Sequence, residues 1–320
     1  MALLLSVSLV LAALAYTQAW VYNNFDNCLN FFYKNQVPSG FQGVALPDLF
    51  DKDDKNLPDL IKRSDLGSPA YICQTYNNIV RFATLYDRGR LMPLYSAYIM
   101  EVKPENVPSL CSRPKNFQSE PQLAYRALKK GDMTADASKV LSDYNDQKKI
   151  DQTDRMKKNQ AKYLLKTSQS GKSDYEKIQD YDKGHLNPCG HHSAHQDKLT
   201  ATFTYTNVVP MIKEMNNKIW SQYEVKMIDI SRSCDNMYVI VGIVPGNVRV
   251  QGSRLYPPAY VWNAYCCVKG GGPFQSGAAL AENVKKSQIQ TFTIEEFQKK
   301  LEKLLDVYHT IELFENNCKR

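Results

Sequence analysis

The stretch YDKGHLNPCGHH, from Tyr181 to His192, governs the interpretation of the rest of the chain. The chain has five histidines, and four of them lie between His185 and His195. Histidine titrates near neutral pH, so such a cluster favours a functional site. His185 directly follows Gly184, which we expect to be flexible. We predict that His185 accepts a proton from water while a metal ion neutralises a phosphate.

A similar stretch, YDRGRLMPLY from Tyr86 to Tyr95, is interpreted differently. Arg90 stands where the base would be needed, and arginine is always protonated and accepts no proton. Two runs of β-favouring residues flank Asp87 and Gly89, which are typical turn residues. We therefore predict a hairpin turn at residues 86–95 and chemistry only at residues 181–192.

The rest of the chain predicts one sheet-rich core with helices around it. Residues Thr200 to Val209 alternate as in a strand, and Pro258 to Val268 is a further β-favouring run. The apolar run Met237 to Val244 is typical of a buried central strand. Apolar residues at helical spacing predict a helix over Asn216 to Ile230. A second, amphipathic helix is predicted over Thr293 to Tyr308, and it begins with a capping box.

The first 19 residues form an uncharged apolar segment that ends in small residues. We predict a signal peptide cleaved after Ala19, because the apolar run from Leu3 to Ala15 is too short to span a bilayer. No second apolar run of spanning length follows, so we expect a secreted mature chain without a membrane span. The eight cysteines then have an oxidising compartment in which to pair, and the sequence leaves their pairing open.

We expect residues 20–320 to form a single domain. Residues 20–70 are expected to be an irregular N-terminal extension, in which the mixed-charge run at 51–65 is a solvated surface insertion. The chain carries a net charge of +7 and a pI of about 8.8, which suits a polyanionic partner. Many basic proteins have no such partner, so charge alone decides little.

Four oxygen-bearing side chains follow the histidine cluster, at Asn207, Asn216, Asn217 and Glu224. Amide and carboxylate oxygens suit a hard cation such as Mg²⁺. Eight residues separate Asn216 from Glu224, which is roughly 12 Å of rise on a straight helix. Both could bind one ion directly only if Asn216 preceded the helix. We therefore expect Glu224 to reach the ion through water, since Mg²⁺ usually keeps several waters.

Several motifs in this order resemble the DNA/RNA non-specific endonuclease family. They are DKGHLNP, then TNVVPM, then Asn216, Trp220 and Glu224. The segments ICQTYNNIVRFATLYD, MYVIVGIV and IELFENNC extend the resemblance, to the secreted animal branch of that family, over nearly the whole chain after the leader. The resemblance implies an α+β fold, a single ββα-metal nuclease domain whose central, mostly antiparallel sheet is flanked by helices.

The same resemblance implies an activity and assigns roles to residues. The expected reaction is hydrolysis of phosphodiester bonds in DNA, RNA or both, with one Mg²⁺ that Mn²⁺ can replace. His185 is expected to be the general base and Asn216 the protein ligand of the ion. Glu224 is expected to orient metal-bound water, and Asn207 to help hold the site. Lys183 is expected to stabilise the transition state.

Further contacts with nucleic acid are expected from Lys115, His191 and His192. Lys183 replaces the arginine that is common in the family, and Ile228 stands where some active members carry another arginine. Lysine lacks the bidentate fork of arginine. These departures keep a second hypothesis open, a weak or inactive pseudonuclease that binds extracellular nucleic acid or another polyanion. A protein interaction domain is a third.

Two other interpretations of the motifs are disfavoured. Cys189, His191, His192 and His195 are close enough in sequence for a zinc site, but we expect Cys189 in a disulfide, and no second ligand pair has zinc-finger spacing. The segment QSGKS, at 169–173, resembles a phosphate-binding loop. It lacks the first glycine of that motif, so we exclude this function.

Overall fold

The computed structural model describes residues 21–47, 67–101, 112–126, 128–129, 131–147 and 155–319. The predicted signal peptide and the predicted solvated insertion at 51–65 lie outside these residues. Within the described ranges, no helix has both the length and the apolar character needed to cross a membrane.

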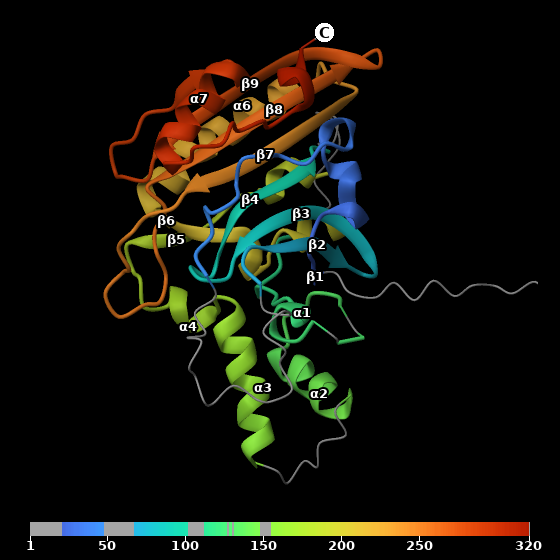
Figure 1. Cartoon of the computed structure of the whole chain (residues 1–320), viewed down its shortest axis with the longest axis vertical. Helices are drawn as coiled ribbons and strands as arrows, with labels where there is room; N and C mark the ends of the chain where they lie inside the picture. The colour runs from blue at the N-terminus through green and yellow to red at the C-terminus, as the bar shows by residue number, and fades with distance from the viewer. Residues whose placement is uncertain are drawn as a thin grey trace, which may run out of the picture.

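The centre of the molecule is an eight-stranded sheet in which every neighbouring pair of strands is antiparallel (Figure 1). Its strands, in spatial order, are β1 (Val21–Tyr22), β2 (Ala70–Tyr76), β3 (Ile79–Asp87), β4 (Met92–Ile99), β7 (Asn236–Val244), β8 (Tyr260–Lys269), β9 (Gly272–Glu282) and β10 (Gln290–Phe292). This confirms the α+β class with a mostly antiparallel central sheet.

Strand β7 is buried on both faces of the sheet, which explains its unbroken apolar sequence. Successive side chains of a strand point to opposite faces. Ile240 therefore belongs to one core cluster, and its neighbours Val239 and Val241 belong to another. The prediction of a buried central strand at 237–244 is confirmed, as is the strand predicted at 258–268.

Helices cover both faces of the sheet, and others form a separate group below it (Figure 1). The helices are α1 (Pro121–Ala124), α2 (Ala137–Gln147), α3 (Arg155–Ser168), α4 (Lys172–Tyr175), α5 (Gln196–Ala201), α6 (Ser221–Ser231) and α7 (Ile294–Leu305). Helix α7 packs in the cluster that contains Ile240, whereas α6 packs in the cluster on the other face. Helices α1, α2 and α3 share a small core of their own.

Helix α7 begins at the predicted capping box. The Thr293 hydroxyl accepts a hydrogen bond from the Glu296 amide at 3.3 Å, and the Glu296 carboxylate accepts from the Thr293 amide at 3.1 Å. The helix ends at Leu305, because Asp306 adopts a left-handed conformation with φ of 52°. Tyr308, the predicted last residue, lies beyond this end and is 97% exposed.

The hairpin predicted at residues 86–95 joins β3 to β4. Asp87 accepts hydrogen bonds from the Arg90 amide at 2.9 Å and the Arg90 guanidinium at 2.6 Å. A Cβ atom on Gly89 would lie 2.4 Å from the carbonyl oxygen of Pro47. Here the aspartate stabilises the turn and the glycine allows another segment to approach, so this stretch is structural.

The strand predicted over Thr200 to Val209 is wrong for most of its length. Helix α5 extends to Ala201, a 3₁₀ turn occupies Tyr205–Asn207, and β6 spans only Val208–Ile212. The Thr204 hydroxyl accepts a hydrogen bond from the Thr206 amide and so caps the turn. Threonine favours strands because its side chain is branched, but its hydroxyl also caps turns. An alternating pattern that contains threonines is therefore compatible with either structure.

The N-terminal residues 21–47 pack against the sheet. They contain short 3₁₀ helices at Asp26–Phe31 and Tyr33–Asn35, and several of their aromatic side chains enter the core cluster of Ile240. A disulfide between Cys28 and Cys73 ties this segment to β2. The division of the chain into a leader, an extension and one domain stays a prediction.

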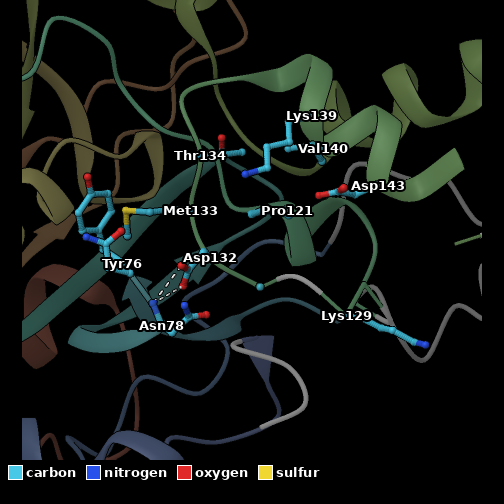
Figure 2. Close-up of a pocket in the computed structure, with 12 residues that line it drawn as sticks. Tyr76, Asn78, Pro121, Lys129, Asp132, Met133, Thr134, Lys139, Val140 and Asp143 are labelled. Atoms are coloured by element: carbon cyan, nitrogen blue, oxygen red, sulfur yellow. Dashed lines mark hydrogen bonds between the residues drawn. The ribbon is translucent and has the colours of Figure 1, made fainter. Parts of the chain in front are cut away.

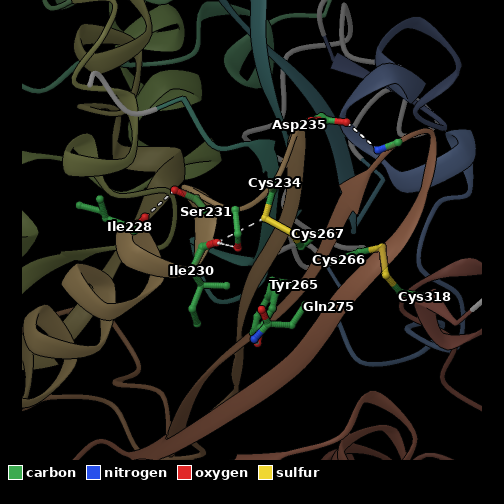
Figure 3. The surroundings of a disulfide bond; sticks show 12 residues. Ile228, Ile230, Ser231, Cys234, Asp235, Tyr265, Cys266, Cys267, Gln275 and Cys318 are labelled. Carbon is green, nitrogen blue, oxygen red and sulfur yellow. Dashed lines mark hydrogen bonds between the residues drawn. A yellow bond between two sulfur atoms is a disulfide. The ribbon is translucent and has the colours of Figure 1, made fainter. Parts of the chain in front are cut away.

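Two further disulfides leave β8 in opposite directions. Cys266 pairs with Cys318, and Cys267 pairs with Cys234 (Figure 3). Adjacent residues of a strand point to opposite faces, so the two bonds attach the C-terminal segment to one face and the end of α6 to the other. In the described part of the chain no cysteine pairs with Cys189, and its predicted disulfide remains a prediction.

We expect the double variant C266S/C318S to lower the free energy of unfolding by about 2–4 kcal/mol, because the bond closes a loop of 52 residues in the unfolded chain. Urea denaturation of the oxidised protein measures the change. C189S is the control for replacing a buried cysteine. An equal midpoint for the double variant and the wild type would contradict the prediction.

Candidate active site

The histidine-rich stretch at residues 181–192 begins a strand, strand and helix unit. Strand β5 (Tyr181–His185) pairs with β6 in an antiparallel sheet of two strands, with His185 opposite Val208. A π-helical segment, Met215–Trp220, follows β6 and continues directly into α6. The predicted helix at 216–230 is therefore confirmed, with an unexpected first part.

Gly184 is a packed strand residue, and this differs from the flexible glycine that we expected. A Cβ atom at this position would lie 2.4 Å from the Met211 sulfur. Glycine leaves room here for the Met211 side chain, which packs directly over residue 184. The backbone that carries His185 is held by the sheet.

His185 is held in a setting that keeps it uncharged. Its ring packs against Phe203, with centroids 4.9 Å apart, and against Phe117 at 5.6 Å. The Nε2 atom is buried and has no hydrogen-bond partner among the described residues. Burial, and then the positive charges of Arg113 and Lys183, lower the pKa of His185 to about 3. The imidazole is therefore neutral at physiological pH.

Asn207 holds the segment that follows His185. Its Oδ1 accepts hydrogen bonds from the Ser96 hydroxyl and the Asn187 amide, both at 2.9 Å. Its Nδ2 donates to the carbonyls of Asn187 and Thr202, also at 2.9 Å. The side chain is fully buried and both its polar atoms are engaged, so neither is available to a ligand, and the predicted role of Asn207 in holding the site stays a prediction.

Two hydrogen bonds hold the helix against the His185 segment. Asn217 donates to the Asp182 carboxylate at 2.6 Å, which joins the first helical turn to β5. The His191 Nε2 atom lies 3.0 Å from the Glu224 carbonyl oxygen, which joins the middle of the helix to the segment after His185.

The π-helical segment changes which residues share a side of the helix. The Ser221 amide donates to the Asn216 carbonyl, five residues back. This turn holds one residue more than an α-helical turn. Glu224 follows Asn216 by eight residues, but the wider turn makes this separation equivalent to about seven residues of α-helix. Seven residues are nearly two full turns of roughly 3.6 residues each. The two side chains thus lie on one side, about two turns apart, and the expectation that Glu224 reaches an ion only through water stays a prediction.

The pKa of the Glu224 carboxyl is raised. Burial raises its pKa to about 8, and the positive charge of Arg113 acts in the opposite direction. A neighbouring cation would favour the charged form further.

Three positive side chains lie on the segments that build this site. The Lys183 ammonium lies 5.2 Å from the centroid of the Phe117 ring and 5.4 Å from that of Tyr175. Lys115 is exposed two residues before Phe117. Arg113 was not predicted, yet its charge acts on both His185 and Glu224. The sequence contains no signal for Arg113 beyond its proximity to Lys115. The segment 112–117 contacts β5 only in the folded chain, so the sequence alone does not connect Arg113 with His185.

His191 and His192, from which contacts with nucleic acid were expected, are buried in the structure. The Nδ1 atom of His191 lies 2.8 Å from the Tyr98 hydroxyl, and its Nε2 atom bonds Glu224 as described above. The Nε2 atom of His192 lies 2.7 Å from Asn187 Oδ1. Both rings are at most 2% exposed, which leaves neither available to a phosphate. We therefore give them a structural role.

The donor set around the helix fits a hard cation. Asn216 is partly exposed, and within the described residues its only side-chain bond is from its Nδ2 to Asn217 at 3.3 Å. An amide oxygen and a carboxylate suit an ion that keeps most of its waters, as Mg²⁺ does. No group of three or more histidine, cysteine or acidic side chains in the described residues is placed to hold a metal. A zinc site at 189–195 is therefore not supported.

A polar pocket of about 330 Å³ lies elsewhere, between the turn after β2 and the segment that leads to α2 (Figure 2). Asp132 lines it and accepts hydrogen bonds from the Asn78 amide at 2.9 and 3.1 Å. None of the predicted site residues lines this pocket, so it is not part of the candidate active site.

An antiparallel sheet, a strand pair with a partly exposed neutral histidine, and a helix with oxygen donors are the features expected of a metal-assisted phosphodiesterase. Residues 62–319 match the family of DNA/RNA non-specific endonucleases, and the chain belongs to this family. The resemblance inferred from the motifs is confirmed.

Three proteins are similar to this chain in sequence, and one solved structure aligns with part of it. The endonuclease domain-containing 1 proteins of Mus musculus and Homo sapiens are each 27% identical over 92% of this chain, which spans 48% of their length, or about half. Human mitochondrial endonuclease G is 32% identical over 62 residues, 19% of this chain and 21% of that protein. The crystal structure of an EndoG/EndoGI complex aligns over 74% of this chain and 84% of the other, with 15% identity and a TM-score of 0.46.

Proposed function

We propose that this chain is a secreted, metal-dependent endonuclease that hydrolyses phosphodiester bonds of DNA, RNA or both with low sequence preference. The observation that carries the proposal is a neutral histidine, His185, on a strand that Asp182 and Asn217 tie to the helical turn of Asn216. Membership of the endonuclease family supports the substrate class. Three disulfides among the described residues are consistent with secretion.

In the proposed reaction a ring nitrogen of His185 takes a proton from water while the water oxygen bonds to phosphorus. The bond between phosphorus and the 3′ oxygen breaks, and this oxygen leaves with a proton from solvent. A base with a pKa of about 3 is weak for this task. The negative charge of a bound phosphate opposes the two cations nearby and raises the pKa of His185 toward the working pH.

The remaining residues act on charge and position. Lys183 and Arg113 lie beside His185 and would neutralise the equatorial oxygens of the phosphate. Asn207 holds the backbone after His185 in place. Asn216 directly and Glu224 through water would hold a divalent ion, which would supply charge stabilisation to the departing 3′ oxygen. Contacts directed at the backbone read no base edges, which accounts for low sequence preference.

Plasmid nicking tests the proposal directly. The purified mature chain should convert supercoiled plasmid to open circles with Mg²⁺ or Mn²⁺, and EDTA should stop the conversion. Single-stranded RNA should be tested in parallel, because the two substrates share the phosphodiester. Binding without cleavage under any divalent ion would overturn the enzymatic proposal.

A second candidate function is a pseudonuclease that binds extracellular nucleic acid or another polyanion. Two observations favour it, the low pKa of His185 and the presence of a lysine at position 183. His185 as a weak base and Lys183 as a point charge would both reduce catalysis. The positive side chains that attract phosphate would still be present. Salt-sensitive DNA binding without nicking would support this candidate. If neither is observed, a protein interaction domain becomes the better description.

We expect the affinity for Mg²⁺ to depend on pH through Glu224. Its pKa of about 8 in the free protein means that the carboxyl is protonated below pH 8, and cation binding must then release a proton. The Mg²⁺ dissociation constant should rise by up to about tenfold for each pH unit below 8. Isothermal titration in buffers of different ionisation enthalpy measures the proton release. In E224Q the release should vanish, and an unchanged release would contradict the assignment.

A further inference from the structure

A second cavity, of about 490 Å³, lies beside the candidate active site and has no role in the mechanism above. Asn116, Phe117 and Ser119 line it, with α2, α3, the start of α4, Tyr205 and Arg254. Its volume is typical of small-molecule sites. The segment 169–173, which resembled a phosphate-binding loop in the sequence, forms part of its wall.

Phe117 is shared by the cavity and the active site. Its ring lies 5.6 Å from the ring of His185 and 5.2 Å from the ammonium of Lys183. The same ring lies 5.5 Å from that of Tyr205, which also lines the cavity. One aromatic side chain therefore separates the proposed position of the scissile phosphate from the cavity.

The chemistry of the lining suits a nucleotide. Apolar and aromatic surface comes from Phe117, Tyr205, Leu141 and Leu165, and aromatic rings stack on any base. The charged lining residues are four cationic and one acidic, namely Lys162, Lys166, Lys172, Arg254 and Asp174. The Arg254 guanidinium donates a hydrogen bond to the Asp174 carboxylate at 2.6 Å, whereas the three lysines are exposed. The cavity thus combines stacking surface with a positive rim.

We propose that this cavity receives one unstacked base of the substrate strand, next to the phosphate held at His185. The inference rests on the proposed function, because the active site fixes where the strand runs. A base paired in a duplex reaches the cavity only after it is unpaired and unstacked, which costs energy. The preferred substrates are therefore single-stranded or locally unpaired nucleic acids.

Binding in EDTA tests the cavity without hydrolysis. A fluorescent single-stranded 12-mer and its duplex are compared by anisotropy at one salt concentration, with wild type and two tryptophan variants. Ala137→Trp fills the cavity from the first turn of α2. Ser142→Trp is the matched control, since it lies on the same helix, is exposed and does not line the cavity. Both positions are exposed, so the fold should tolerate either change.

We expect wild type to bind the single strand at least about fivefold more tightly than the duplex, since one stacked base is worth that much. A137W should remove this difference by weakening only single-strand binding, and S142W should leave it intact. Equal binding of the two substrates by wild type, or equal behaviour of the two variants, would overturn the inference.

The same variants separate this inference from the proposed function. Absence of nicking together with single-strand binding that A137W weakens would refute the enzyme and keep the base site. Nicking together with single-strand binding that A137W does not change would keep the enzyme and refute the base site.

Discussion

His185→Ala should reduce plasmid nicking by roughly 10²–10⁴-fold, the usual contribution of a general base. The substitution removes the imidazole that accepts the proton from water, and it leaves Lys183, Arg113 and the rim lysines in place. DNA binding in EDTA should therefore persist and weaken with added salt, as expected for phosphate contacts. Initial rates of nicking and anisotropy on the same preparation measure the two effects.

His195→Ala is the matched control for this variant. His195 belongs to the same histidine cluster, but its side chain is 61% exposed and lies 3.4 Å from the Glu101 carboxylate. It has no place in the proposed mechanism, so the rate should stay within about twofold of wild type. Unchanged nicking by H185A would show that another group accepts the proton. An equal loss in both variants would instead mean that the segment as a whole is disturbed.

Asn216→Ala should abolish nicking at millimolar Mg²⁺ and lower the affinity for the ion by on the order of tenfold or more. The variant removes the single protein oxygen that the proposal places directly on the ion, and a hard cation gains little from the remaining neighbours. Mn²⁺ binding followed by electron paramagnetic resonance gives a readout that does not depend on activity. Saturating Mn²⁺ should restore part of the lost rate.

Asn216→Asp separates loss of the ligand from loss of the fold. Aspartate keeps an oxygen at the same distance along the side chain and adds a negative charge, so ion binding should be retained or strengthened. Asn236→Ala is the control for removing an asparagine, because Asn236 is exposed at the start of β7. Ion affinity in N216A equal to that in N236A would contradict the role of Asn216.

The elements that are predicted correctly have patterns contained in a few neighbouring residues. Strand β7 is a continuous apolar run, and α7 starts at a capping box whose two partners are three residues apart. The turn between β3 and β4 is distinguished from the catalytic stretch by Arg90, because arginine accepts no proton. The predicted strand at 200–209 is wrong because its threonines cap a turn that contacts Gln118, far away in the sequence.

The histidine cluster shows where local patterns stop being sufficient. Its four histidines are equivalent candidates in the sequence, yet His191 bonds to Tyr98, 93 residues earlier, and becomes structural. His185 ends a strand and keeps a buried, unpartnered nitrogen among the residues that the structure describes. Burial and pKa depend on which distant segments pack around a side chain, and the local sequence does not contain that information.

The order of motifs along the chain was by itself sufficient for the resemblance to the family. That resemblance implied the antiparallel sheet, which the structure confirms, and it named His185, Asn216 and Glu224 as candidate site residues. Tertiary structure alone decided the π turn that aligns Asn216 with Glu224, the place of Arg113 and the cavity behind Phe117. Each depends on contacts between segments tens of residues apart, and such contacts exist only once the chain has folded.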